Sequence, residues 1–128
     1  MPYGIEHIGL MAKDTEALAA WYERVFGFQV VYRNKKTPPT FFLAPESGAM
    51  IEIFPYKEGA TVLSGAEREG IHLAIAATDF DSACADLKQK GVTFNGEPKE
   101  STNGVKVVFF QDPEENWVQL IYRPQPLK

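Results

Sequence analysis

The chain has 128 residues, of which 45% are hydrophobic and 23% charged, a composition typical of one soluble globular domain. Its net charge of −4 and its lack of a basic run argue against binding to nucleic acid or to an anionic membrane. No apolar stretch approaches the roughly 18 residues of a membrane span, and no secretory signal is visible. Because Cys84 is the single cysteine, no internal disulfide can form, which fits a cytoplasmic protein.

The first half of the chain predicts a strand, a helix and then three further strands. Asp14 can cap the start of the helix, because its carboxylate accepts free backbone N–H groups there, and Gly27 can end it. The helix has one apolar face, formed by Leu18, Trp21, Tyr22, Val25 and Phe26. The turn-forming sequences TPP and APESG separate the strands. The expected elements are a strand at about 5–12, a helix at about 14–26, and strands at about 27–34, 39–44 and 49–55.

The second half of the chain repeats this order of elements. Each half opens with a histidine that stands seven residues before an aspartate, as His7 and Asp14 and again as His72 and Asp79. The expected elements are a strand at about 70–77, a helix at about 80–90 capped by Asp79 or Asp81 and ended by Gly91, and strands at about 92–95, 105–111 and 116–123. The sequence therefore predicts one α+β domain with two tandem βαβββ modules, at about 1–65 and 66–128. Because one module cannot cover both faces of its sheet, the modules must pack on each other or on another chain.

Each module also carries one polar residue within its last, otherwise apolar strand. These residues are Glu52 in MIEIFPY and Gln119 in WVQLIYR. Because side chains alternate along a strand, each of these residues and each histidine can be assigned to a face that otherwise carries small or bulky apolar residues. The opposite face is aliphatic, as expected beneath a helix. The sequence thus predicts a concave surface with four polar side chains, His7, Glu52, His72 and Gln119, and with walls formed by Met11, Met50, Phe54 and Trp117.

Two imidazoles, one carboxylate and one amide oxygen can together hold a divalent metal. Zinc, nickel, cobalt, manganese and ferrous iron accept such ligands, and two histidines with one carboxylate also fit a non-haem iron oxygenase. A carboxylate in an apolar strand needs a metal or a charged partner, since burying it alone is costly. Three alternatives stay open: the histidines can be hydrogen-bonded structural residues, Glu52 can pair with Arg33 or Arg123, and Gln119 can lie on an exposed edge strand.

Five motifs extend over nearly the whole chain: EHIGLMAKD, WYERVFGF, MIEIF, IHLAIAATDFDSACADLKQKGV and FFQDPEENWVQLI. Together they resemble the glyoxalase/bleomycin-resistance/dioxygenase group, the vicinal oxygen chelate superfamily. The resemblance implies two βαβββ modules forming a cupped mixed sheet around one divalent metal, and a homodimer that builds each site from both chains. It places the metal ligands at His7, Glu52, His72 and Gln119. Zinc or nickel is the first expectation, with manganese, cobalt or iron as alternatives.

The sequence departs from this family at the fourth ligand position, where glyoxalase I enzymes normally have a glutamate that serves as the catalytic base. Gln119 cannot take that role, because an amide has no usable proton affinity near neutral pH, although its carbonyl oxygen can still bind a metal. Glu52 is then the only carboxylate left to act as the base. Of three positions that bind glutathione in glyoxalase I, Met11 and Tyr56 depart from the family and Arg68 fits it.

The resemblance implies a metal-dependent lyase or isomerase of the glyoxalase type, similar to lactoylglutathione lyase. Its substrate would be a small molecule with vicinal oxygens, not necessarily linked to glutathione. The substrate-binding residues expected are Met11, Met50, Phe54, Arg68 and Trp117. Two alternatives exist on the same scaffold: a ferrous-iron dioxygenase, and a metal-free protein that sequesters a ligand as bleomycin-resistance proteins do. The family's usual turn glycine is replaced by Glu115, which is expected to alter only that turn.

Overall fold

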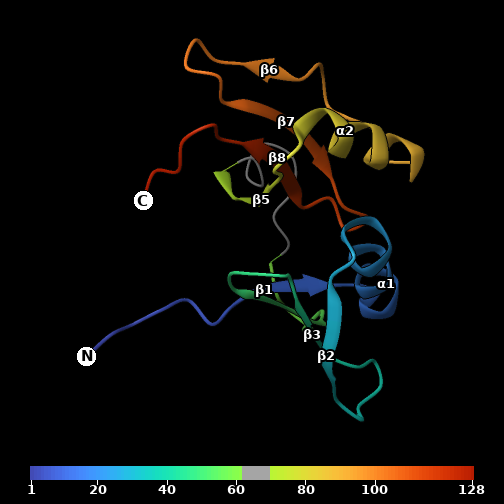
Figure 1. Cartoon of the computed structure of the whole chain (residues 1–128). Coiled ribbons are helices and arrows are strands. Elements are labelled where there is room, and N and C mark those ends of the chain that lie inside the picture. The colour runs from blue at the N-terminus through green and yellow to red at the C-terminus, as the bar shows by residue number, and fades with distance from the viewer. Residues whose placement is uncertain (62–69) are drawn as a thin grey trace. The chain divides into compact units, whose positions relative to one another are not determined.

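The computed structural model describes residues 1–61 and 70–128, and the chain divides into two compact units, Met1–Val62 and Leu63–Lys128 (Figure 1). Each unit contains one helix and one four-stranded sheet in the order βαβββ. This repetition confirms the predicted α+β fold with two βαβββ modules. In the parts of the chain described, neither helix has the length and apolar character needed to cross a membrane.

The first unit is built on a mixed sheet. Its elements are β1 His7–Ala12, α1 Thr15–Phe26, β2 Gln29–Arg33, β3 Phe41–Ala44 and β4 Met50–Pro55. The strand order is β1-β4-β3-β2, in which β1 and β4 are parallel and the other neighbours are antiparallel. The first and last strands of the unit are therefore neighbours, and they are the strands that carry His7 and Glu52.

Helix α1 covers one face of this sheet. The Asp14 carboxylate accepts a hydrogen bond from the Ala17 N–H at 2.9 Å at the helix start, and Gly27, with φ 71°, donates its N–H to the Glu23 carbonyl at its end. The helix packs on β3 and β4. The large hydrophobic side chains that are buried here are those of Leu18, Tyr22, Val25, Phe41, Leu43, Ile51 and Ile53. Burying each large aliphatic side chain contributes about 1.5–3 kcal/mol to stability, which keeps the aliphatic face of the sheet packed against α1. The opposite face is not covered by this helix and can carry a site.

The second unit repeats the architecture. Its elements are β5 His72–Ala76, α2 Phe80–Gln89, β6 Lys99–Glu100, β7 Lys106–Gln111 and β8 Trp117–Tyr122, in the sheet order β5-β8-β7-β6. Strands β5 and β8 are parallel. Asp79 caps α2 by accepting the Ser82 N–H at 3.1 Å. The buried apolar residues of this unit are Phe80, Leu87, Val92, Val108, Phe110, Val118 and Leu120.

The strand predicted at about 92–95 is wrong. That stretch makes only an isolated bridge, between Phe94 and Phe110, and the strand that pairs with β7 is the two-residue β6. Gly96, with φ 87°, turns the backbone away from the extended path, and Pro98 has no N–H to donate to a sheet. The outer segment therefore leaves the edge of β7 between residues 94 and 99 and rejoins it at β6.

Candidate functional site

The face of the first sheet that points away from α1 carries His7 and Glu52. In the parallel register, His7 lies opposite Met50, Gly9 opposite Glu52, and Met11 opposite Phe54. Directly paired residues of neighbouring strands point to the same face, so these residues share one face, as predicted. Met11, Met50 and Phe54 thus lie beside the first pair of candidate ligands.

Gly9 gives Glu52 and Phe54 the room to lie over β1. A Cβ added at Gly9 would lie 3.0 Å from Phe54 Cε1 and 3.5 Å from Glu52 Oε1. The first distance is shorter than an ordinary van der Waals contact between carbon atoms. A side chain at this position would therefore displace the groups that form the face.

The His7 and Glu52 side chains approach each other on this face. His7 Nε2 lies 3.6 Å from Glu52 Oε1, with the side chains 38% and 27% exposed. On the other edge of the ring, His7 Nδ1 lies 2.5 Å from the Glu6 carboxylate. The ring meets Phe42 edge-on, with centroids 5.2 Å apart. A histidine whose Nδ1 bonds to a carboxylate presents Nε2 as the free ligand atom, so this half of the site has a nitrogen and an oxygen donor close together.

Glu52 does not pair with Arg33. Arg33 pairs with Glu16 at 3.0 Å, and its guanidinium lies 5.1 Å from the centre of the Phe41 ring. Phe41 pairs with Ile53, on the face opposite Glu52. Arg33 therefore neutralises a residue of α1 and leaves the Glu52 carboxylate with His7 beside it.

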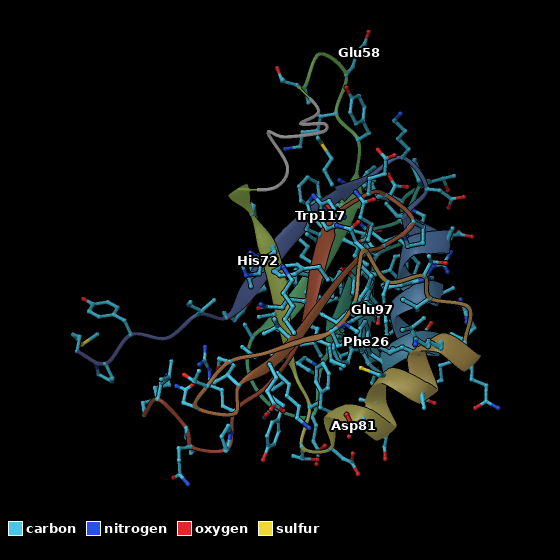
Figure 2. The ribbon with its side chains drawn as sticks, turned by 90° about the horizontal axis from the view of Figure 1, so that it is seen from above. Phe26, Glu58, His72, Asp81, Glu97 and Trp117 are labelled. Atoms are coloured by element: carbon cyan, nitrogen blue, oxygen red, sulfur yellow. The ribbon has the colours of Figure 1, made fainter. Side chains whose placement is uncertain are left out.

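In the second unit, a histidine and a polar residue again lie on neighbouring parallel strands, but the polar residue is an amide and not a carboxylate. His72 lies opposite Trp117 and Ala74 opposite Gln119 on the parallel strands β5 and β8, and Figure 2 labels His72 and Trp117 on these neighbouring strands. Phe109 meets the His72 ring edge-on, with centroids 5.5 Å apart, and pairs with Gln119. The four candidate ligands are thus divided equally, two in each unit.

Neither unit alone forms a complete metal centre from the residues described. Within residues 1–61 and within residues 70–128, no three His, Cys, Asp or Glu side chains gather in a group that could hold an ion. Arg68, predicted to bind substrate, lies outside the described residues.

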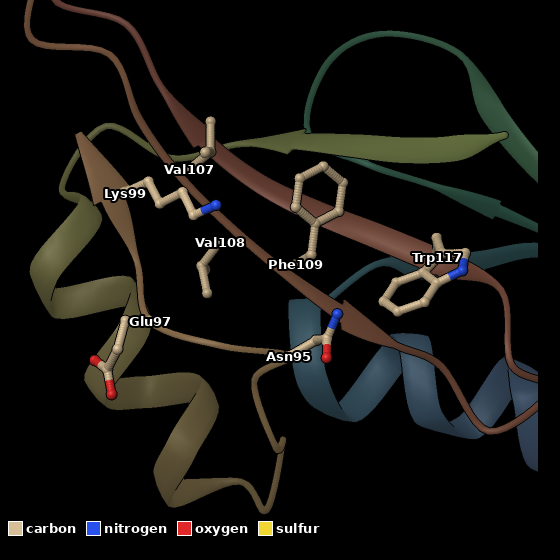
Figure 3. Close-up of a pocket in the computed structure, with 7 residues that line it drawn as sticks. All are labelled: Asn95, Glu97, Lys99, Val107, Val108, Phe109 and Trp117. Atoms are coloured by element: carbon tan, nitrogen blue, oxygen red, sulfur yellow. The ribbon is translucent and has the colours of Figure 1, made fainter. Parts of the chain in front are cut away.

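A hollow of about 320 Å³ opens in the second unit beside the face that carries His72 (Figure 3). It is lined by Asn95, Glu97, Lys99, Val107, Val108, Phe109 and Trp117. Of these, Trp117 alone is a predicted site residue. The others lie in the turn-rich sequence NGEPK and in the apolar run VVFF, a pattern that predicts a turn and a strand but not a hollow beside them.

Cys84 is not part of this face. It lies on α2, which packs against the opposite side of the sheet. Burial raises the pKa of the Cys84 thiol, and the Asp81 carboxylate adds to the effect. The thiol therefore stays protonated near neutral pH and is a poor nucleophile or metal ligand.

The chain thus has two βαβββ modules. Each module carries a histidine and a second polar residue on the face of its sheet that lies away from the helix. The chain belongs to the Glyoxalase/Bleomycin resistance protein/Dioxygenase superfamily, whose family model matches residues 4–120. It is 26% identical over 144 residues to a lactoylglutathione lyase of Schizosaccharomyces pombe, an alignment that covers 93% of this chain and 47% of that protein. This chain therefore spans about half the length of that relative.

Solved structures share the fold. A member of the same superfamily from Sphaerobacter thermophilus DSM 20745 is 20% identical, with a TM-score of 0.76, and the match covers 96% of this chain and 98% of that one. TnmS3, an antibiotic binding protein from Streptomyces sp. CB03234, is 18% identical, with a TM-score of 0.74 and coverage of 95% and 97%. Proteins with different roles can share one fold, so the function of this chain has to be argued from its side chains.

Proposed function

We propose that the protein is a metal-dependent lyase or isomerase of the glyoxalase type that acts on a small substrate with vicinal oxygens. The observation that carries the proposal is the His7–Glu52 pair, with 3.6 Å between Nε2 and Oε1, together with His72 and Gln119 at the matching register positions of the second unit. A lactoylglutathione lyase among the relatives supports the same reaction class.

The donor atoms present fit a divalent metal. His7 and His72 supply imidazole nitrogen, Glu52 a carboxylate oxygen and Gln119 an amide oxygen, a set that suits zinc or nickel first and manganese, cobalt or iron as alternatives. A hydrogen bond from Nδ1 to the Glu6 carboxylate favours the tautomer whose Nε2 carries the lone pair that a metal needs. As part of the same proposal, the protein is a homodimer in which each site takes ligands from both chains.

In this proposal Glu52 moves the proton. A divalent ion in the site would act as a Lewis acid on the vicinal oxygens of the substrate. Glu52 has two carboxylate oxygens, so one can serve as ligand while the other accepts a proton from the substrate carbon. Gln119 can bind and orient but cannot accept that proton. With one carboxylate instead of two, the site is more positive by one charge and favours an anionic substrate.

The apolar residues on the same faces shape the binding site. Met11, Met50 and Phe54 lie beside His7 and Glu52, and Trp117 lies opposite His72. With Arg68 as the basic residue, they would bind the substrate and exclude water from the reacting atoms. Met11 and Tyr56 replace residues expected for glutathione, which favours a substrate without that group.

The test is the metal content of untagged protein, measured by elemental mass spectrometry beside a His7→Ala/His72→Ala double variant. We expect about one divalent ion per chain in the wild type, a loss of that ion in the double variant, and no change in Glu58→Gln, which removes an exposed carboxylate. Circular dichroism checks that all three proteins are folded. Absence of metal from the wild type, even after incubation with nickel, zinc, manganese and iron, would rule the proposal out.

A second candidate is a metal-free ligand-binding protein, favoured by the hollow between Asn95 and Trp117 with its aromatic wall. TnmS3, described as an antibiotic binding protein, has the same fold. This function does not require the two histidines. Ligand binding that persists in the presence of EDTA and in the His7→Ala/His72→Ala variant, with no metal in the wild type, would favour it over the enzyme.

A further inference from the structure

The hollow in the second unit exists because the outer edge of the sheet is bulged. Phe94 pairs with Phe110 and Lys99 pairs with Val107. The outer segment thus advances five residues, from 94 to 99, while β7 advances three, from 107 to 110. The two extra residues push the segment away from β7, and the space left behind is the hollow.

The inner wall of the hollow is aromatic. Phe109 and Trp117 both point to the face that carries His72 and Gln119, because Phe109 pairs with Gln119 and Trp117 with His72. Both rings are half-buried. Their faces and edges offer the offset or edge-on contacts that a flat ring system prefers.

The outer rim of the hollow carries a positive charge. Lys99 pairs with Val107 and shares its face, and Figure 3 shows its side chain extending in the direction of Phe109. The Glu97 carboxylate points away from these rings in the same view, and the Asn95 side chain lies nearer to Trp117 than the Lys99 side chain does. The hollow therefore combines an apolar slot with one cation and one amide.

The charge of Lys99 is not neutralised by a neighbour among the described residues. Lys106, one position further along the same strand pair, lies 3.8 Å from Asp81 and 3.7 Å from Glu100. Lys99 makes no such ion pair within residues 1–61 and 70–128. A cation that is unpaired at the rim of an apolar slot is available for an anionic ligand group.

We propose that this hollow binds a planar aromatic carboxylate, with the ring system against Phe109 and Trp117 and the carboxylate at Lys99. Asn95 would hydrogen-bond a second polar group at the opposite end. Since Trp117 lies directly opposite His72, the end of the ligand away from Lys99 would reach the candidate metal ligands. The inference gives the proposed function a substrate class, an aromatic acid, but the binding step itself needs no metal.

The test compares two probes of the same shape in buffer with EDTA. They are 1-naphthoate, which carries a carboxylate, and 1-naphthalenemethanol, which is neutral. In ¹⁵N-labelled wild-type protein, we expect both probes to shift the Trp117 indole and the backbone signals of Asn95, Lys99 and Phe109. The naphthoate should bind about tenfold more tightly, because it alone gains a charge-assisted bond to Lys99.

Two lysine variants separate a specific bond from general attraction. Lys99→Met should weaken naphthoate binding about tenfold and leave the neutral probe unchanged, whereas Lys106→Met, which removes the same charge from the other face, should change neither. Equal binding of the two probes, equal loss in both variants, or signal changes confined to other parts of the chain would overturn the inference. If the protein binds metal but not naphthoate, this inference is wrong and the proposed enzyme function still stands. If it binds naphthoate but no metal, the proposed enzyme function is wrong and this inference still stands.

Discussion

The two units of the chain present the same aromatic support for a histidine. In the first, His7 meets Phe42 with ring centroids 5.2 Å apart and planes at 79°. In the second, His72 meets Phe109 at 5.5 Å and 78°. In both units the phenylalanine pairs across the sheet with the polar residue of the last strand. A repeated strand register therefore reproduces the geometry without repeating the surrounding side chains.

The units differ in charge at the equivalent position. The residue that pairs with the phenylalanine is Glu52 in one unit and Gln119 in the other. Both side chains offer an oxygen, but only the carboxylate offers a negative charge and proton affinity near neutral pH. The repeated strand register therefore places an oxygen atom at the same position in both units. Because only Glu52 is a carboxylate, the proposed proton transfer belongs to the first unit.

Glu52→Gln is the variant expected to have the largest effect. It would leave two amides and two imidazoles, so no charged ligand would remain in the proposed site. We expect divalent-metal affinity to fall about 100-fold, equal to about 2.7 kcal/mol, and turnover to be lost with it. Competition against a fluorescent chelator measures the affinity, with Glu58→Gln as the control. Unchanged affinity would show that Glu52 is not a ligand.

The reciprocal variant, Gln119→Glu, would make the two units alike. A second carboxylate should raise metal affinity about tenfold, or roughly 1.4 kcal/mol, and supply a second base. We expect the stability of the metal-free protein to change little, which thermal unfolding in EDTA would monitor. If the affinity does not rise, the carbonyl position of Gln119 does not face the metal.

Gly9 and Ala74 form a smaller contrast between the units, since each lies opposite the polar residue of the last strand. Gly9→Ala would bring a methyl group to 3.0 Å from Phe54 Cε1 and 3.5 Å from Glu52 Oε1. We expect metal affinity to fall about tenfold as these groups move. Ala74→Gly should cost stability of about 0.5–1 kcal/mol and change metal affinity by less than about threefold. Equal effects on metal affinity would contradict a tight approach at Gly9.

The sequence sufficed for the features that depend on local pattern. Asp14 and Asp79 cap the two helices as predicted, because a carboxylate before an apolar helical repeat has one common use. Strand alternation placed His7 and Glu52 on a common face, because each of their strands runs without a bulge.

Other features depend on pairing that the sequence pattern does not encode. Phe42 and Phe109 support the histidines only through the register of neighbouring strands. Arg33 forms its ion pair with Glu16 and not with Glu52 because of the way β2 lies beside α1. The bulge at Gly96 could not be predicted, because a turn-forming sequence does not determine whether the chain pairs again with the edge of the sheet, as it does at Lys99.

The turns before the last strands also differ between the units. Gly48, two residues before Met50, has φ 92°, and Glu115, two residues before Trp117, has φ 67°. Glu115 is the one residue other than glycine with positive φ in the described part of the chain, so an L side chain occupies a conformation that favours glycine. Glu115→Gly removes a steric cost of about 1–2 kcal/mol and adds an entropic cost of about 0.4–1 kcal/mol, so we expect it to stabilise the protein by about 0.5–1 kcal/mol in urea unfolding. Gly48→Ala should destabilise it by about 1 kcal/mol. A loss of stability in Glu115→Gly would mean that the side chain stabilises the turn.

The smallest effect expected concerns the cap of α2. The backbone N–H and then the side chain of Ser82 hold the pKa of the Asp79 carboxyl below its ordinary value. A carboxyl whose pKa is lower in the folded state stabilises the fold above its unfolded pKa of about 3.9 and loses that contribution as the pH falls through the folded value. Asp79→Asn keeps a good cap but removes the titration, so wild type and variant should unfold alike at pH 7. Below about pH 4 the wild type should lose stability faster than the variant. Parallel pH profiles would show that the Ser82 contact is too weak in solution to favour the ionised carboxylate.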